Sequence, residues 1–220
     1  MLELHTLSLG MVQAYLLVFD QGLILVDAGM PGYTGRVLRK MSSLGRGDLR
    51  LIYITHAHID HYGSAASLRK ATKAPIAIHS ADEYAMSHGE SPLGEPRGRG
   101  RIVGAMMPLA ERLIPLTPSK PDIVLKDGDS LRDYGLDAYV LHTPGHTMGS
   151  TSLIVEDRLA FVGDLLSTSG KPHAQRLFAQ DWSVIEDSID RLKAARPEWI
   201  YTGHGRRPLS YAELLQLEVE

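Results

Sequence analysis

The chain has 220 residues, of which 44% are hydrophobic and 22% are charged, with a formal net charge of −3 at pH 7. This length suits one globular domain, and the weak charge gives no electrostatic basis for binding nucleic acid or an anionic membrane. The lack of cysteine excludes disulfides and thiolate metal sites, so any metal must be held by nitrogen and oxygen. The sequence contains no run of about 18 apolar residues, so we expect no membrane span. The first ten residues do not resemble a signal peptide. We therefore expect a cytoplasmic protein.

Apolar runs separated by turn signals predict alternating strands and helices in the first part of the chain. The apolar runs on either side of the Asp-Gln-Gly stretch are typical of a β-hairpin, and Gly45 is a typical residue to close a helix. A further helix could begin within residues 81–88. In chain order we predict strands at 14–19 and 23–29, a helix at 31–45, a strand at 49–55, a short helix at 64–72 and a strand at 74–79.

Residues 89–121 interrupt this order. The stretch 89–104 is rich in Gly, Pro and Arg and has no clear hydrophobic period, which predicts an irregular excursion. A short helix fits within it around residues 105–114. Such a long connection in a compact domain is usually functional or disordered, and we expect this insertion to lie near the active site.

The last hundred residues return to regular patterns. Residues 181–195 have an Asp at the start and apolar residues on one helical face, as in an amphipathic helix. Hairpins beside crossovers favour mixed sheets flanked by helices, in a single domain over residues 1–220. In chain order we predict strands at 136–143, 150–156 and 159–164, the helix at 181–195, a strand at 198–205 and a terminal helix at 210–219.

A dense group of histidines follows the strand predicted at residues 49–55. The stretch THAHIDHYG, residues 55–63, holds three His and one Asp within six consecutive positions. A composition-only estimate gives such a pattern in roughly one chain of this kind in a thousand. Imidazole and carboxylate groups are metal ligands. Other candidate ligands also stand at the ends of apolar strand-like runs, where a rigid scaffold holds them: Asp27, His146, Asp164 and His204.

In order along the chain, the segments VDAG, THAHIDH, HTPGHTMGS, FVGD and TGHG resemble the successive motifs of the metallo-β-lactamase-fold hydrolases. The resemblance runs from Ala14 to Pro208. It implies an α/β chain folded as a four-layer αββα sandwich, with a metal site at one edge of the two sheets.

The resemblance also implies a ligand for each motif. Three or four protein ligands for each of two metals leave open positions, as a catalytic site requires. Zinc is the expected metal, with iron or manganese as the alternatives. The implied assignment is His56, His58 and His146 for one metal, Asp60, His61 and His204 for the second, Asp164 as a bridge, and Asp27 as a residue that orients ligands by hydrogen bonds.

The implied chemistry is hydrolysis at a carbonyl group. Two metals about 3.5–4 Å apart share a hydroxide that attacks the carbonyl carbon, with Asp60 and Asp164 as the catalytic carboxylates. The ligand pattern resembles the glyoxalase II-like branch, whose members hydrolyse thioesters such as hydroxyacylglutathione. We expect no partner beyond a small acyl substrate, and the oligomeric state stays open.

Departures from related families leave two alternatives. A lactonase for acyl-homoserine lactones shares the pattern, but its usual Tyr shortly after the bridging Asp is missing here. A mononuclear-iron persulfide dioxygenase has similar motifs with fewer ligands. Against glyoxalase II itself, we expect no room for its C-terminal helical domain after the last motif, so the substrate stays open.

Four residues are candidates for substrate contacts. Met106 and Met107 lie in the 89–121 insertion, where adaptable side chains could form an apolar wall. Lys171 and His173 follow the bridging Asp and could reach an anionic substrate at the mouth of the site. For each, ordinary packing or a solvated loop is the competing interpretation.

Overall fold

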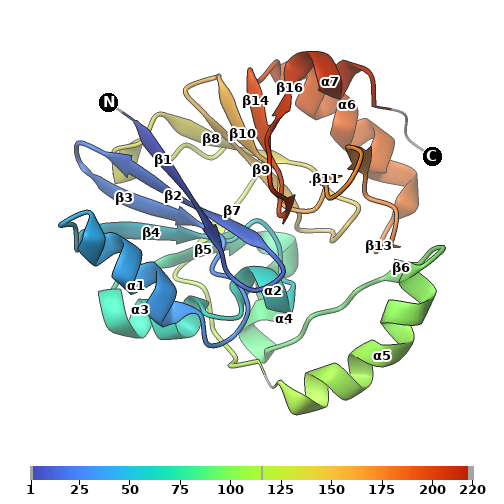
Figure 1. The fold of residues 1–220 in the computed structure, drawn as a ribbon, viewed down its shortest axis with the longest axis horizontal. Helices are drawn as coiled ribbons and strands as arrows, with labels where there is room; N and C mark the ends of the chain where they lie inside the picture. The colour runs from blue at the N-terminus through green and yellow to red at the C-terminus, as the bar shows by residue number, and fades with distance from the viewer. Residues whose placement is uncertain (1, 115, 218–220) are drawn as a thin grey trace.

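Two β-sheets lie face to face at the centre of the protein in the computed structural model (Figure 1). The structure describes residues 2–114 and 116–217, with the side chains of residues 107–113 excepted. The six-stranded sheet contains, in spatial order, β1 (Glu3–Ser8), β2 (Gln13–Phe19), β3 (Gly22–Val26), β4 (Leu49–Tyr53), β5 (Ile76–His79) and β7 (Ile123–Leu125). The five-stranded sheet contains β16 (Leu209–Ser210), β14 (Trp199–Tyr201), β10 (Leu159–Phe161), β9 (Thr151–Val155) and β8 (Ala138–His142).

Two small sheets join loops at one end of the sandwich. One contains β12 (His173–Ala174), β11 (Leu166–Thr168) and β15 (His204–Gly205), and the other contains β13 (Phe178–Ala179) and β6 (Glu95–Pro96). The helices are α1 (Thr34–Ser43), α2 (Ile59–Tyr62), α3 (Ala65–Thr72), α4 (Glu83–His88), α5 (Gly100–Leu113), α6 (Ile185–Ala195) and α7 (Tyr211–Leu215). None of the helices in the described residues has the length and apolar character needed to cross a membrane.

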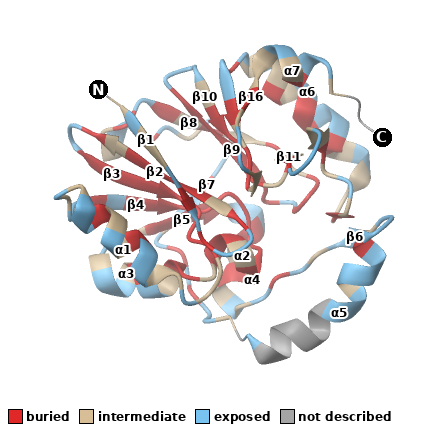
Figure 2. Cartoon of the chain, viewed as in Figure 1, coloured by how far each residue is buried: buried red, intermediate tan, exposed pale blue. Residues whose placement is uncertain are grey.

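The alternation of side chains along each strand produces the layers. On β2, Leu17 enters the core between the two sheets, whereas Leu16 faces the core beneath α1 and α3. On β9, Leu153 faces the first sheet and Ile154 packs in the cluster that includes α6. Because both faces of each sheet are covered, these strands carry apolar residues on both faces, and most of their residues are buried (Figure 2). The predicted four-layer αββα arrangement is therefore confirmed.

Parallel pairing brings several strand ends to one edge. Strands β3, β4, β5 and β7 pair parallel in the first sheet, and β10 pairs parallel with β14 in the second. Consecutive parallel strands end at the same edge of a sheet, so the loops that follow them gather there. The His-rich loop follows β4, and Asp164 follows β10.

The structure differs from the sequence-based prediction in several segments: the short strands β6, β7, β11, β12, β13 and β16 and the short helix α2 were not predicted. Two larger differences have clear physical reasons. The insertion at 89–121 is not irregular throughout, because α5 extends over 14 residues from Gly100, despite Gly104 and Pro108 within it. Its first part reaches the sandwich, where β6 pairs with β13. Strand β1 was not predicted: it is an edge strand, and its polar, half-exposed residues carry little apolar periodicity.

Candidate metal centre

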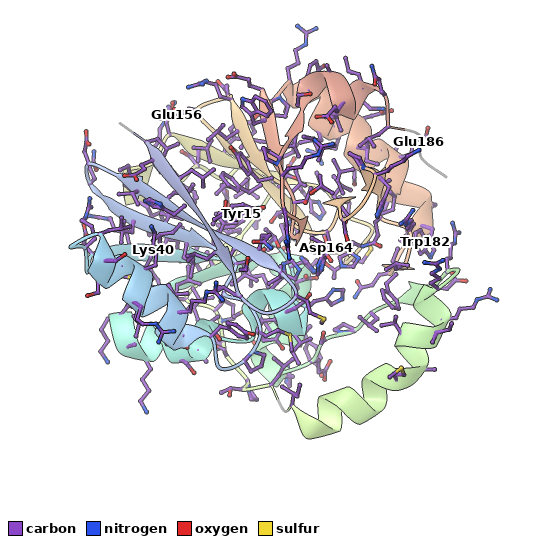
Figure 3. The ribbon with its side chains drawn as sticks, in the orientation of Figure 1. Tyr15, Lys40, Glu156, Asp164, Trp182 and Glu186 are labelled. Carbon is purple, nitrogen blue, oxygen red and sulfur yellow. The ribbon has the colours of Figure 1, made fainter. Side chains whose placement is uncertain are left out.

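Loops from distant parts of the chain bring seven side chains together at one end of the sandwich. Their ligand atoms form three overlapping groups, and within each group the atoms lie within 4.8 Å of one another. Figure 3 marks Asp164 beside the strand ends of both sheets. The groups are His56, His58 and His146; His56, His61 and Asp164; and Asp60, His61 and His204.

The first group consists of buried imidazoles only. The Nε2 atom of His56 and the Nδ1 atom of His58 lie 3.1 Å apart, and the ring of His146 stands edge-on to both at 4.7 and 4.5 Å between centroids. All three residues are at most 3% exposed. They are the three residues that the sequence analysis assigned to one metal.

Asp60, His61 and His204, called the second ligand group below, combine imidazoles with a carboxylate, and Asp164 adjoins them. The Nε2 atom of His204 lies 3.3 Å from Oδ2 of Asp60 and 3.2 Å from Oδ2 of Asp164. The other oxygen of Asp164 lies 3.2 Å from Nε2 of His61, while its Oδ2 also lies 3.5 Å from Nε2 of His146. Asp164 thus stands between the two groups, in contact with histidines of both.

Each of the five histidines has its second ring nitrogen held by another group. Such contacts fix the ring orientation and tautomer, so that the inward nitrogen keeps its lone pair for a metal. The contacts are His56 Nδ1 with Thr55 Oγ1 at 3.0 Å, His58 Nε2 with Pro92 O at 3.0 Å, His61 Nδ1 with Asp27 Oδ2 at 2.8 Å, His146 Nδ1 with Phe178 O at 2.9 Å, and His204 Nδ1 with Met11 O at 3.1 Å.

Asp27 lies behind the cluster and organises the His-rich loop. Its Oδ1 accepts a hydrogen bond from the Thr55 amide at 2.8 Å, and its Oδ2 lies 2.8 Å from His61 Nδ1. It adopts the left-handed backbone region at φ 62°, which Asp tolerates better than most residues. Asp27 therefore contacts Thr55 and His61 from behind, and its role in orienting a metal ligand stays a prediction.

The two groups differ in charge. Burial and neighbouring imidazoles lower the pKa of His56 well below its usual value and that of His146 to about 4. Asp164 raises the pKa of His204 to about 10 against the effect of burial. Burial opposes ionisation of Asp60, but His61 and His204 lower its pKa to about 2. The first group therefore offers neutral nitrogens, and a cation at the second would replace protons on its imidazoles.

Three buried atoms of the cluster lack a hydrogen bond, and they indicate whether a cation fits there. Nε2 of His61, Nε2 of His146 and Oδ1 of Asp164 are buried and make no hydrogen bond. A buried polar atom without a partner costs about 1–3 kcal/mol. All three belong to the residues that converge on the cluster, and imidazole and carboxylate donors suit divalent metals. The residues therefore fit a pair of metal ions.

Glycine 203 provides the space that this convergence requires. A Cβ atom at this position would meet Oδ1 of Asp164 and, at 2.6 Å, Cε1 of His61. Any larger residue would displace both side chains. A glycine beside the ligand His204 is therefore required by direct contact.

Two further residues position the site and carry no sequence motif. Asp82 is 3% exposed and accepts hydrogen bonds from the Ala57 amide at 2.7 Å, the Thr147 hydroxyl at 2.8 Å and the Gly149 amide at 2.9 Å. It thereby ties the His-rich loop to the loop that carries His146. The Gln175 side chain donates to the backbone oxygen of Asp164 at 3.1 Å.

The proposed substrate contacts lie outside these ligand groups. The side chain of Met106 is 68% exposed on α5, and that of Met107 lies outside the described residues. Lys171 is exposed. The Nδ1 atom of His173 donates to the backbone oxygen of Ala174 at 2.7 Å.

Comparison with known proteins agrees with the fold and the cluster. A relative, the probable metallo-hydrolase YflN of Bacillus subtilis strain 168, is 28% identical in an alignment 222 positions long. The alignment covers 91% of this chain and 83% of that protein. Hydroxyacylglutathione hydrolase of Cereibacter sphaeroides is 31% identical over 172 residues, and the match covers 77% of this chain but only 53% of that enzyme. The crystal structure of TTHA1623 in a di-iron-bound form has a TM-score of 0.67 at 26% identity, with 97% of each chain covered.

A protein-family model matches most of the chain. The model of the metallo-beta-lactamase superfamily matches residues 7–204, a range that contains all seven side chains of the cluster. Because the match spans most of the chain, the protein belongs to the metallo-β-lactamase superfamily.

Proposed function

We propose that this protein is a metal-dependent hydrolase that cleaves a thioester or a related acyl compound. The observation that carries the proposal is the position of Asp164, whose oxygens lie 3.2–3.5 Å from histidines of both ligand groups. A carboxylate placed in this way fits a pair of metals better than a single one. The similarity to a metallo-hydrolase and to a hydroxyacylglutathione hydrolase supports this class of reaction.

The residues would hold two divalent ions, for which we propose zinc. His56, His58 and His146 would hold one ion, Asp60, His61 and His204 would hold the other, and Asp164 would contact both. Nitrogen and oxygen donors also suit iron and manganese, and the similar TTHA1623 structure holds two irons. The chemistry that such a pair supplies is the activation of water near neutral pH and the polarisation of a carbonyl group.

The carboxylates of this chain would manage the proton of the attacking water. Asp60 and Asp164 are 14% and 10% exposed, so they face the partly open side of the cluster. A carboxylate oxygen of Asp60 would accept the hydrogen bond that orients the water. Asp27 would keep His61 in place through its bond to Nδ1, and Thr55 would do the same for His56.

The choice of a thioester as the proposed substrate depends on the ligand pattern. The chain has Asp60 and His61 after the first two histidines of the His-rich loop and an aspartate at position 164, the combination that resembles the glyoxalase II-like branch. A lactone presents the same carbonyl chemistry, whereas a persulfide dioxygenase would use a single iron. Metal stoichiometry and substrate range therefore separate these functions.

The test is turnover of a substrate panel by the purified, metal-loaded protein. We expect hydrolysis of thioesters above that of lactones, a β-lactam, phosphodiesters and a persulfide, with two metals per chain. Turnover of the persulfide alone, with one iron per chain, would overturn the proposal.

Substitution of Asp164 tests whether this carboxylate is needed for turnover. In Asp164→Ala we expect turnover to fall by more than about 100-fold, beyond the effect of losing an indirect contact to a metal. The circular dichroism spectrum should stay that of the parent, because the three apolar clusters do not include this side chain. Undiminished turnover in this variant would exclude the shared role of Asp164.

A further inference from the structure

A polar cavity of about 470 Å³ opens beside the second ligand group. The turn between β1 and β2 forms one wall, with Ser8 and Met11. The end of β11, with Ser169 and Gly170, forms another, and Arg206 closes the cavity at the end of β15. The mechanism above does not use any of these side chains.

The cavity adjoins the metal centre at His204. His204 bonds through Nδ1 to the backbone oxygen of Met11 at 3.1 Å, and Met11 lines the cavity. Gly205, which follows His204, also lines it and pairs with Thr168 across β11 and β15. A molecule with its carbonyl at the cluster could therefore extend past His204 into this space.

Glycine 170 keeps the cavity open. A Cβ built at this position would have no other atom within 4 Å, and the residue has φ 83°, in the left-handed region. Side chains rarely adopt that backbone conformation, so the space next to Gly170 stays free of protein atoms.

Arg206 lines this space and carries a positive charge that no ion pair in the described residues neutralises. Its neighbour Arg207 forms an ion pair with Glu213 at 2.8 Å, but within the described part of the chain no carboxylate pairs with Arg206. A guanidinium group binds a carboxylate through two parallel hydrogen bonds. Ser169 and Thr168 also line the cavity, so its wall contains hydroxyl-bearing residues beside the arginine.

We propose that this cavity binds a carboxylate group of the substrate and that Arg206 is the residue that selects for it. The proposal rests on the proposed function, since it places the carboxylate on a molecule whose acyl carbonyl is at the cluster. Either the acyl part or the thiol leaving group could carry the charge, and the test separates these two sources.

The first experiment compares three thioesters of similar size on the metal-loaded enzyme. One is neutral, S-butanoyl-N-acetylcysteamine. The second carries the charge on the acyl part, as S-succinyl-N-acetylcysteamine, and the third carries it on the leaving group, as S-butanoyl-3-mercaptopropionate. We expect the parent enzyme to prefer one charged substrate over the neutral one, and the preferred substrate identifies the source of the carboxylate.

The variants test whether Arg206 causes the preference. In Arg206→Ala the ratio of kcat/KM for the preferred charged substrate to that for the neutral one should fall about tenfold or more, through KM rather than kcat. Arg206→Lys should retain part of the preference. Arg207→Ala is the matched control, because it removes an adjacent arginine that is already paired, and its ratio should equal that of the parent. An equal loss in both alanine variants would contradict the proposal.

A binding measurement keeps this inference separate from the proposed function. Calorimetric titration of the metal-loaded protein with glutarate should give an affinity about tenfold weaker in Arg206→Ala than in the parent or in Arg207→Ala. Equal affinity in all three proteins would overturn the inference, even if thioesters are hydrolysed. Arg206-dependent glutarate binding without turnover of any thioester would instead overturn the proposed function and leave the carboxylate site intact.

Discussion

Asp27 shows how much of the site depends on a side chain that does not face the centre of the cluster. One of its oxygens accepts a hydrogen bond from the Thr55 amide, and the other lies against Nδ1 of His61. Both contacts require an acceptor. The orientation of His61 therefore depends on the charge and geometry of a residue 34 positions away in the sequence.

The variant Asp27→Asn tests this dependence. Asparagine also tolerates the left-handed backbone at this position, and its oxygen can still accept from Thr55. Its amide then presents a donor to the N–H of His61. We expect metal affinity to fall about 10–100-fold, the usual effect of losing a contact that orients a ligand, as measured by competition with a chelator. Parental metal affinity in a folded Asp27→Asn protein would show that this contact does not position His61.

The residues of the site were predictable to different degrees from sequence. The seven cluster residues stand in motifs at the ends of apolar runs, and the structure brings all of them together. Asp82 and Gln175 lie in ordinary polar stretches. Their roles depend on loops that meet only in three dimensions, because Asp82 contacts residues 25 and 65 positions away. No local pattern encodes such a contact.

The secondary-structure elements were also predictable only where a local sequence pattern encodes them. Strands β2, β3, β4 and β9 are largely buried on both faces, so each contains a run of apolar residues that predicts a strand, although β4 includes the exposed Arg50. Helix α5 was underestimated because glycine and proline in a sequence weigh against a helix. Edge strand β1 lacked the apolar alternation by which a half-buried strand is recognised.

Helix α7 offers a prediction about pH. Ser210 caps the helix and Glu213 completes a reciprocal capping box, while Glu213 also pairs with Arg207. Arg207 and the Ser210 amide lower the pKa of Glu213 from 4.5 to about 2. Because the folded-state pKa is lowered, the stabilisation is present above pH 4.5 and is lost as the pH falls toward 2.

We expect Glu213→Gln to lower the free energy of unfolding by up to about 1 kcal/mol at pH 6, a small effect because water screens this exposed pair. The gap to the parent should narrow at pH 3. Urea unfolding of both metal-free proteins at the two pH values measures it. A gap that is equal or larger at pH 3 would show that ionised Glu213 does not stabilise the helix.

At the scale of the whole molecule, the fold and the metal site are largely separate. Three apolar clusters hold the four layers together: one between the first sheet and its helices, one between the sheets, and one beneath α6. None of the seven cluster residues belongs to them. The sandwich should therefore persist without metal, while the loops at its end lose a source of stability.

Removal of metal tests this separation. A ligand that binds only the folded state adds about 2.7 kcal/mol at a free concentration of 100 times its Kd. For a domain of this size, chelation should then lower Tm by roughly 5–11 °C. The far-ultraviolet circular dichroism spectrum should keep its shape below Tm. Complete loss of that spectrum on chelation would mean that the metals, rather than the apolar clusters, hold the fold.

The most direct test of the account is an anomalous diffraction map from crystals grown with zinc. The account predicts two peaks, one among His56, His58 and His146 and the other among Asp60, His61 and His204, with Asp164 in contact with both. A map with no peak among these residues, or with a single peak that Asp164 does not touch, would contradict it.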